Sequence, residues 1–124
     1  MGNLVLIADD DRDIVRFVAL NLRLEGFEVV VANDGQDALD KALDVRPSLI
    51  VLDTMMPRMD GYEVCSRLRH QRPDAHIPVI MLTAKSLEAD RSMAYTAGAN
   101  DWVTKPFDPA DLVSKVKNHL GRAS

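Results

Sequence analysis

The stretch LVLIADDDRD, residues 4–13, joins a continuous apolar run to a cluster of four aspartates. Its first half is apolar at successive positions rather than at alternate ones, which is typical of a strand buried on both faces in a parallel sheet. Aspartate side chains are almost never fully buried unless they are paired. Aspartates at the end of such a strand can cap a helix, lie on the surface or bind a cation.

The same kind of apolar run recurs along the chain. Further runs occupy residues 28–32, 48–53, 78–83 and 101–104. The segments between them carry apolar residues at the three- and four-residue intervals of a helix, with Gly or Pro near their ends. The sequence therefore predicts helices that end before Gly26, span residues 35–46, follow Gly61, span residues 87–97 and span residues 110–120.

Strand and helix alternate five times, which predicts crossover helices on both faces of a parallel sheet. We expect one α/β domain over residues 1–124, doubly wound, with its core at residues 4–120. The predicted core face of the first helix consists of Ile14, Phe17, Val18 and Leu22, flanked by Leu20 and Leu24. Cys65 shares an apolar helix face with Leu68, so we expect it in the core rather than at a reactive site.

Composition restricts the class of protein. The 124 residues have a formal net charge of −4, which argues against broad binding to nucleic-acid phosphates. A single cysteine permits no internal disulfide, and no apolar run approaches the length of about 20 residues that crosses a bilayer. We therefore expect a cytoplasmic protein that is not bound to membranes.

Polar residues follow the predicted strands at one end. Asp9 and Asp10 close the first strand, Asp53 the third and Thr83 the fourth, and Lys105 follows the fifth. The carboxyl ends of parallel strands share one edge of the sheet, and ligands of such sheets bind there. These residues are therefore predicted to form one cluster in space, whereas Asp11 and Asp13 are interpreted as acids of the first helical turn.

Three carboxylates in one cluster repel each other, so they either take up protons or bind a cation. An all-oxygen set suits Mg²⁺, with Mn²⁺ as an alternative ion, and the three histidines fall at helix or loop positions away from the strand ends. A carboxylate can form an acyl phosphate, while Mg²⁺, a lysine and a hydroxyl stabilise the phosphoryl oxygens. The cluster is thus suited to phosphoryl transfer.

The segments LIADDD, LIVLDTMMPRMDGYEV, PVIMLTA and GANDWVTKPF together resemble the receiver domain of bacterial two-component response regulators. The resemblance covers the chain from Leu4 to about Leu120. It implies a flavodoxin-like (βα)5 three-layer sandwich with strand order 2-1-3-4-5. It also implies that Asp53 is the phosphoacceptor, that Asp10 binds the metal directly and Asp9 largely through water, and that the backbone carbonyl of Met55 is a further metal ligand.

The resemblance assigns the remaining site residues as well. Lys105 is implied to pair with the phosphoryl group and Thr83 to donate a hydrogen bond to it, with small Ala84 leaving the approach open. Pro57 and Asp60-Gly61 are implied to shape the loop after Asp53, and the Lys105–Pro106 bond to be cis. Trp102 departs from the usual Tyr or Phe at the switch position, and a bulkier indole needs more space for an inward ring movement and a partner for its N–H group.

A member of this family accepts its phosphoryl group from a histidine kinase or phosphotransfer protein, hydrolyses it slowly and is not otherwise an enzyme. Its state is read by an effector or a second copy at the face formed by the fourth helix, fifth strand and fifth helix. Alternatives are an aspartyl-nucleophile phosphohydrolase, which Met55 disfavours because a second Asp usually stands there, and an interaction module independent of phosphate. The chain ends in HLGRAS without a DNA-binding module, so a stand-alone regulator and part of a longer one both remain open.

Overall fold

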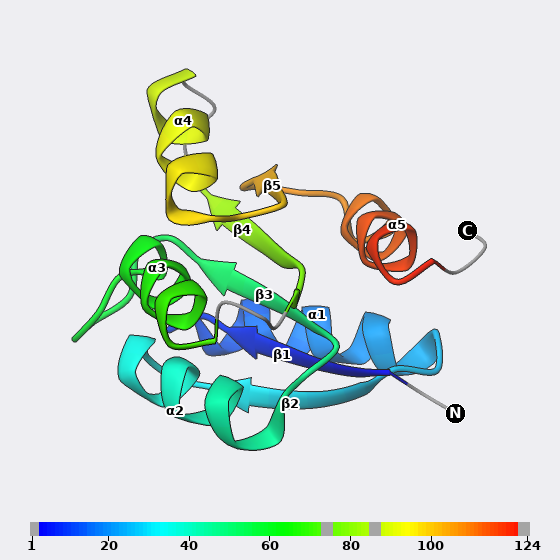
Figure 1. The fold of residues 1–124 in the computed structure, drawn as a ribbon. Coiled ribbons are helices and arrows are strands. Elements are labelled where there is room, and N and C mark those ends of the chain that lie inside the picture. The colour runs from blue at the N-terminus through cyan, green and yellow to red at the C-terminus, as the bar shows by residue number, and fades with distance from the viewer. Residues whose placement is uncertain (1–2, 73–75, 85–87, 122–124) are drawn as a thin grey trace.

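The computed structural model describes residues 3–72, 76–84 and 88–121. Its strands are β1 (Leu4–Ala8), β2 (Glu28–Ala32), β3 (Leu49–Asp53), β4 (Val79–Thr83) and β5 (Asp101–Thr104). Its helices are α1 (Arg12–Leu24), α2 (Gly35–Val45), α3 (Gly61–Gln71), α4 (Glu88–Ala97) and α5 (Pro109–His119). Strand and helix alternate throughout, as the sequence predicts (Figure 1).

Within the described residues the strands form one five-stranded parallel sheet in the order β2-β1-β3-β4-β5, so the predicted fold class and strand order are confirmed. β1 lies between β2 and β3, with Val5 opposite Val29 on one side and Leu49 on the other. The strand order reverses at β1, and ligands of open α/β sheets bind at the carboxyl ends of strands next to such a reversal.

Helices cover both faces of the sheet and form two apolar layers with it. On one face, Leu6 and Ala8 of β1 pack in a cluster with residues of α2, α3 and α4. On the other, Val5 and Ile7 pack with residues of α1 and α5. Successive side chains of a strand point to opposite faces, which is why an uninterrupted apolar run serves both layers. In Figure 1, α2 and α3 lie on the near face of the sheet and α1 behind it.

The predicted core face of α1 is partly wrong. The buried residues of α1 are Val15, Val18, Ala19 and Leu22. Phe17 is 49% exposed, Leu20 56% and Leu24 73%. Eight of the 13 residues of this helix are apolar, so the pattern alone allowed more than one face. The small side chains of Val15 and Ala19 pack against the sheet, and Phe17, about 100° around the helix from Val18, is turned outward.

Aspartates fix the start of several helices. The side chain of Asp11 accepts hydrogen bonds from the backbone N–H groups of Asp13 and Ile14 and caps α1. Asp60 caps α3 in the same way through Glu63, and Asp108 precedes Pro109 at the start of α5. Capping satisfies N–H groups that have no partner inside the helix. Asp13 lies in the first turn of α1 as interpreted from the sequence, whereas Asp11 stands just before the helix as its cap.

Candidate functional site

The carboxyl ends of β1, β3 and β4 bring together residues that lie far apart in the sequence. Asp53 is the last residue of β3 and Thr83 the last of β4, while Asp9 follows β1 directly. The arrowheads of β1 and β3 point to the same edge of the sheet in Figure 1. Asp9 is 1% exposed, Asp53 5% and Thr83 6%. Burying such polar groups is costly without partners, so each contact that they make matters.

Lys105 supplies a positive charge to this edge. Its Nζ lies 2.9 Å from Oδ2 of Asp9 and 3.3 Å from Oδ1 of Asp53. Asp9 also accepts a hydrogen bond from the backbone N–H of Asp11 at 2.9 Å. The predicted convergence of Asp9, Asp53 and Lys105 is therefore present, and Lys105 compensates two buried carboxylates at once.

Asp10 completes an acidic cluster with Asp9 and Asp53. Oxygen atoms of the three carboxylates lie within 4.8 Å of one another, and Asp10 is exposed. Opposite ligands of an octahedral Mg²⁺ ion are about 4 Å apart, because each lies about 2 Å from the metal. An all-oxygen set at this spacing, open to water on the side of Asp10, fits Mg²⁺.

Burial governs the ionisation of Asp53. Loss of hydration and the nearby negative charge of Asp9 raise the pKa of Asp53 to about 6, although Lys105 and the backbone N–H of Met55 act in the opposite direction. Burial disfavours the charged form of Lys105, but its hydrogen bond to Asp9 and the two carboxylate charges outweigh that effect and raise the pKa of Lys105. The lysine therefore carries its charge at neutral pH.

The loop after Asp53 folds back onto the strand end. The N–H of Met55 donates to Oδ1 of Asp53 at 3.3 Å, and the N–H of Gly61 donates to the carbonyl of Thr54 at 3.1 Å. A Cβ atom on Gly61 would lie 2.2 Å from the carbonyl oxygen of Asp53. Only glycine fits this close approach. The carbonyl of Pro57 accepts from Met59 and Gly35, which holds the outer part of the loop.

Sequence reasoning did not single out Thr54. This residue is 5% exposed. Its backbone N–H donates to the carbonyl of Leu82 at 3.0 Å, and its carbonyl accepts a hydrogen bond from the N–H of Gly61. It therefore joins β3 to β4 and fixes the backbone on the far side of Asp53. The Asp60-Gly61 pair was the only hint in the sequence that the chain returns to this point.

β4 and the segment after β5 lie side by side at the site. The backbone N–H of Lys105 donates to the carbonyl of Thr83 at 2.7 Å. The Lys105–Pro106 peptide bond is cis, the isomer that the resemblance implies. Ala84 is exposed and follows Thr83 directly, so no bulky side chain stands at that position.

Trp102 lies on β5 and packs against α4. Its ring centroid is 5.1 Å from that of Tyr95, at an interplanar angle of 89°, which is an edge-to-face arrangement. Trp102 is half-buried and Tyr95 is 55% exposed, so the pair lies at the surface of the α4–β5 side.

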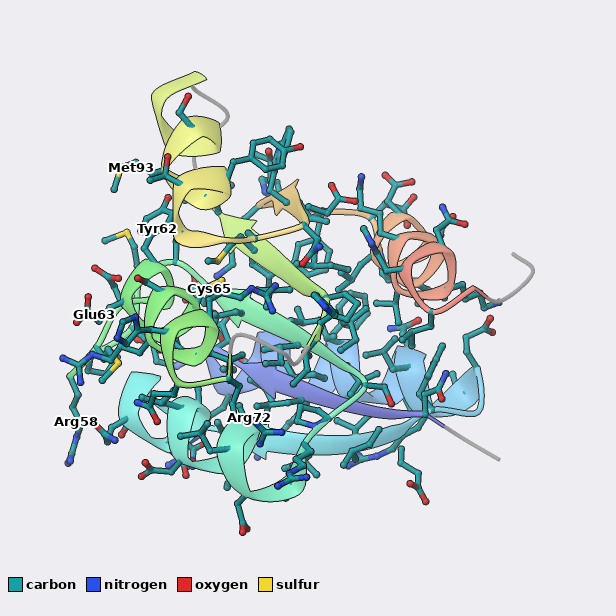
Figure 2. The ribbon with its side chains drawn as sticks, viewed as in Figure 1. Arg58, Tyr62, Glu63, Cys65, Arg72 and Met93 are labelled. Atoms are coloured by element: carbon teal, nitrogen blue, oxygen red, sulfur yellow. The ribbon has the colours of Figure 1, made fainter. Side chains whose placement is uncertain are left out.

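Other candidate residues are placed away from this edge. Cys65 is fully buried on the inner side of α3, as predicted (Figure 2). Two lysines of α5 are paired with acids, because Lys115 lies 3.3 Å from Asp101 and Lys117 pairs with Glu25. Met55 is the exception, because it lies beside the site with its backbone N–H on Asp53 and its side chain 71% exposed. Among the described residues no helix combines the length and apolar character needed to span a bilayer.

Comparison with known proteins identifies one family. The family model described as the response regulator receiver domain matches residues 5–117. The alkaline phosphatase synthesis transcriptional regulatory protein PhoP of Bacillus subtilis (strain 168) is 43% identical over 123 residues, which make up 99% of this chain and 50% of that protein. This chain thus spans about half the length of that relative.

Solved structures agree with the sequence comparisons. A putative response regulator from Chloroflexus aurantiacus is 37% identical with a TM-score of 0.92, covering 98% of this chain and 100% of that one. Chemotaxis protein CheY4 of Vibrio cholerae is 33% identical with a TM-score of 0.89, covering 95% and 98%. Response regulator DrrB of Thermotoga maritima, an OmpR/PhoB homolog, is 34% identical with a TM-score of 0.88, covering 98% and 54%.

Proposed function

This chain belongs to the response regulator receiver domain family of two-component signalling, and on that premise we propose that it is a switch operated by phosphorylation of Asp53. The observation that carries the proposal is the convergence of three carboxylates and the Lys105 ammonium at one edge of the sheet. Receiver domains are in general phosphoacceptors rather than enzymes. The proposed unit is a single receiver domain over residues 1–124.

The acidic cluster is the proposed metal site. Receiver domains use Mg²⁺, and the carboxylate spacing in this chain fits that ion. Asp10, Asp53 and the backbone carbonyl of Met55 would hold it, with Asp9 acting through water, and Mn²⁺ could replace it. When bound, the ion neutralises charge on the phosphoryl oxygens.

Asp53 is the proposed nucleophile. A bond forms between its carboxylate oxygen and the phosphorus while the P–N bond of a donor phosphohistidine breaks, and the donor nitrogen regains a proton. With a pKa of about 6, Asp53 is mostly ionised at neutral pH and can attack. The ammonium of Lys105 already lies 3.3 Å from Asp53, so a short movement brings it to the phosphoryl oxygens.

Thr83 is the proposed sensor of the new charge. Thr83 is the last residue of β4. It lies beside Asp53, because the residue before it, Leu82, is opposite Asp53 in the sheet. Its hydroxyl would donate a hydrogen bond to a phosphoryl oxygen. The movement of Thr83 toward the phosphoryl group would favour a second arrangement of α4, β5 with Trp102, and α5. Slow hydrolysis of the acyl phosphate would reset the domain.

Membership of the family implies a histidine kinase as partner, together with an effector or a dimer mate. We propose that the kinase or a phosphotransfer protein docks at the edge that carries Asp53, and that the output partner reads the α4–β5–α5 face. PhoP of Bacillus subtilis is described as a transcriptional regulatory protein, which makes a longer transcription regulator one proposed setting for this domain. A cytoplasmic location is part of the same proposal.

The experiment that tests this function is phosphoryl incorporation from a small phosphodonor in the presence of Mg²⁺. The wild-type protein should take up one phosphoryl group, and Asp53→Asn should take up none. Asp13→Ala, in the first turn of α1, is the matched control and should be labelled like the wild type. Label that persists in Asp53→Asn would show that the acceptor is wrong.

A further inference from the structure

α3 starts against the backbone of Asp53. The N–H of Gly61, the first residue of α3, donates to the carbonyl of Thr54, and the Gly61 backbone lies too close to the Asp53 carbonyl for any larger residue. The first turn of α3 is also capped by Asp60 through the N–H of Glu63 at 2.8 Å. A displacement of the Asp53 loop therefore displaces the start of α3.

Near its other end, α3 holds the turn between α4 and β5. Arg69 Nε and Nη2 donate to the carbonyl of Gly98 at 3.1 and 2.9 Å, and Nη2 also donates to Oδ1 of Asn100 at 2.9 Å. Gly98 has φ +101°, and a Cβ atom there would lie 2.8 Å from Cγ of Arg69. One guanidinium thus binds two residues of this turn.

The turn is also tied to the sheet. Oδ1 of Asn100 accepts the N–H of Val79 at 2.9 Å, and the N–H of Asn100 donates to the carbonyl of Val79 at 2.9 Å. Arg69, Asn100 and Val79 therefore connect α3, the start of β5 and the start of β4. Because a planar guanidinium donates in fixed directions, it holds its acceptors in a defined geometry.

The residues on either side of this turn form the aromatic pair of the α4–β5 side. Tyr95 accepts the N–H of Gly98 through its carbonyl at 2.9 Å, and Trp102 stands two residues after Asn100. A shift of the turn therefore changes how the Tyr95 and Trp102 rings meet. α3 and α4 are direct neighbours as well: Tyr62 and Met93 line one groove between them (Figure 2).

We propose that α3 is a second connection between Asp53 and Trp102, separate from the one through Thr83, and that Arg69 is the positioning residue at its far end. The inference rests on the proposed phosphorylation of Asp53. The added phosphoryl group displaces the loop from Asp53 to Gly61, α3 moves as one hydrogen-bonded helix, and Arg69 transfers the movement to the turn that carries Trp102. Hydrogen-bond networks and rigid helices are physical carriers of such coupling, and the contacts from Gly61 to Asn100 form a network of this kind.

The fluorescence of Trp102, the only tryptophan in the chain, reports on this connection. The response to a small phosphodonor with Mg²⁺ is compared in the wild type, Thr83→Ala, Arg69→Met and the double variant, with phosphoryl incorporation measured in parallel. Per phosphoryl group incorporated, Thr83→Ala should keep a reduced response, and the double variant should lose that response. Arg67→Met is the matched control on α3, since its partner Glu63 lies on the same helix.

A double variant that responds as strongly as Thr83→Ala overturns the inference, and so does a Thr83→Ala variant with no response at all. If Arg69→Met does not fold, Arg69→Lys replaces it, because a lysine keeps the charge but cannot bridge Gly98 and Asn100 with a rigid fork. A wild-type protein that takes up no phosphoryl group contradicts the proposed function. If the protein is labelled but its residual Trp102 fluorescence response is the same with and without the Arg69 substitution, only the inference is contradicted.

Discussion

Lys105 and Asp9 form an ion pair at 2.9 Å in which the Asp9 side chain is fully buried and the Lys105 side chain is 20% exposed. The lysine that would later contact the phosphoryl group is thus already held by a residue of the acidic cluster. The same ammonium compensates Asp53 at 3.3 Å. Stability and the proposed chemistry of the site therefore depend on the same charges.

Replacing Lys105 tests this dependence. Lys105→Met leaves the buried Asp9 carboxylate uncompensated and should lower the free energy of unfolding by about 3 kcal/mol in the presence of a chelator. Saturating Mg²⁺ should restore more stability to this variant than to the wild type, because the cation takes over the compensation. Urea unfolding measures both. Lys115→Met is the control and should lower the free energy of unfolding by less than about 1 kcal/mol, since His119 still contacts Asp101 at 3.0 Å. Similar losses of stability in the two variants would contradict the account.

Asp53 makes stability depend on pH. Its pKa rises from 3.8 in the unfolded chain to about 6 in the folded protein, so the folded state binds the proton more tightly. The contribution of Asp53 is therefore fully present below about pH 4 and is lost as the pH rises through about 6. Without Mg²⁺, Asp53→Asn should be more stable than the wild type at pH 7, by about 2–3 kcal/mol, and the gap should close near pH 4.

Chemical denaturation at the two pH values measures this gap. Asp44→Asn, an exposed position on α2, is the control and should change stability little at either pH. A gap that is equal at pH 4 and pH 7 would show that the gain does not come from ionisation of Asp53.

Position 61 requires glycine because the backbone of Asp53 leaves no room for a side chain, not because the backbone there needs a conformation that favours glycine. Gly61→Ala would place a Cβ atom 2.2 Å from the carbonyl oxygen of Asp53, so the loop must shift or the helix must start elsewhere. We expect a loss of more than about 3 kcal/mol in stability, together with weaker phosphorylation. Gly26→Ala is the matched control: Gly26 has φ +91° with no atom within 4 Å of the new Cβ, so only backbone strain of about 1–2 kcal/mol is expected. Thermal unfolding of both variants tests the difference, and equal losses would argue against the close contact.

Metal binding should separate the neighbouring aspartates. Mg²⁺ at 100 times its dissociation constant should stabilise the wild type by about 2.7 kcal/mol. Asp10→Ala should remove this gain at little cost to the metal-free fold, because Asp10 is exposed. Asp13→Ala should keep it. Unfolding curves recorded with and without Mg²⁺ decide, and an Asp10→Ala protein that retains the full gain would exclude Asp10 as a ligand.

The fold was predictable because local signals agreed with one another. Continuous apolar runs gave strand bounds within one residue, as for residues 48–53 against Leu49–Asp53. Capping aspartates and helix-ending glycines gave helix bounds with similar accuracy. The meeting of Asp9, Asp53, Thr83 and Lys105 followed from the shared edge of parallel strands.

Contacts between distant side chains could not be predicted in this way. The bond from Arg69 to Gly98 joins residues 29 positions apart, and no spacing rule pairs them. The Nζ atom of Lys105 lies 2.9 Å from Asp9 but 3.3 Å from Asp53. Which of the two acids is the nearer partner depends on side-chain geometry that the sequence pattern does not give. The outward position of Phe17 was missed because most neighbours on α1 are apolar too, so the pattern did not select a unique face.

The central claim is that Asp53 carries the phosphoryl group, and locating the modification tests it most directly. An acyl phosphate is reduced by borohydride to an alcohol, so a phosphorylated aspartate is converted into homoserine. After phosphorylation with Mg²⁺, reduction and proteolysis, mass spectrometry should find homoserine at position 53 in the wild type and none without the phosphodonor. Homoserine at Asp9, Asp10 or any other position, with Asp53 unchanged, would contradict the account.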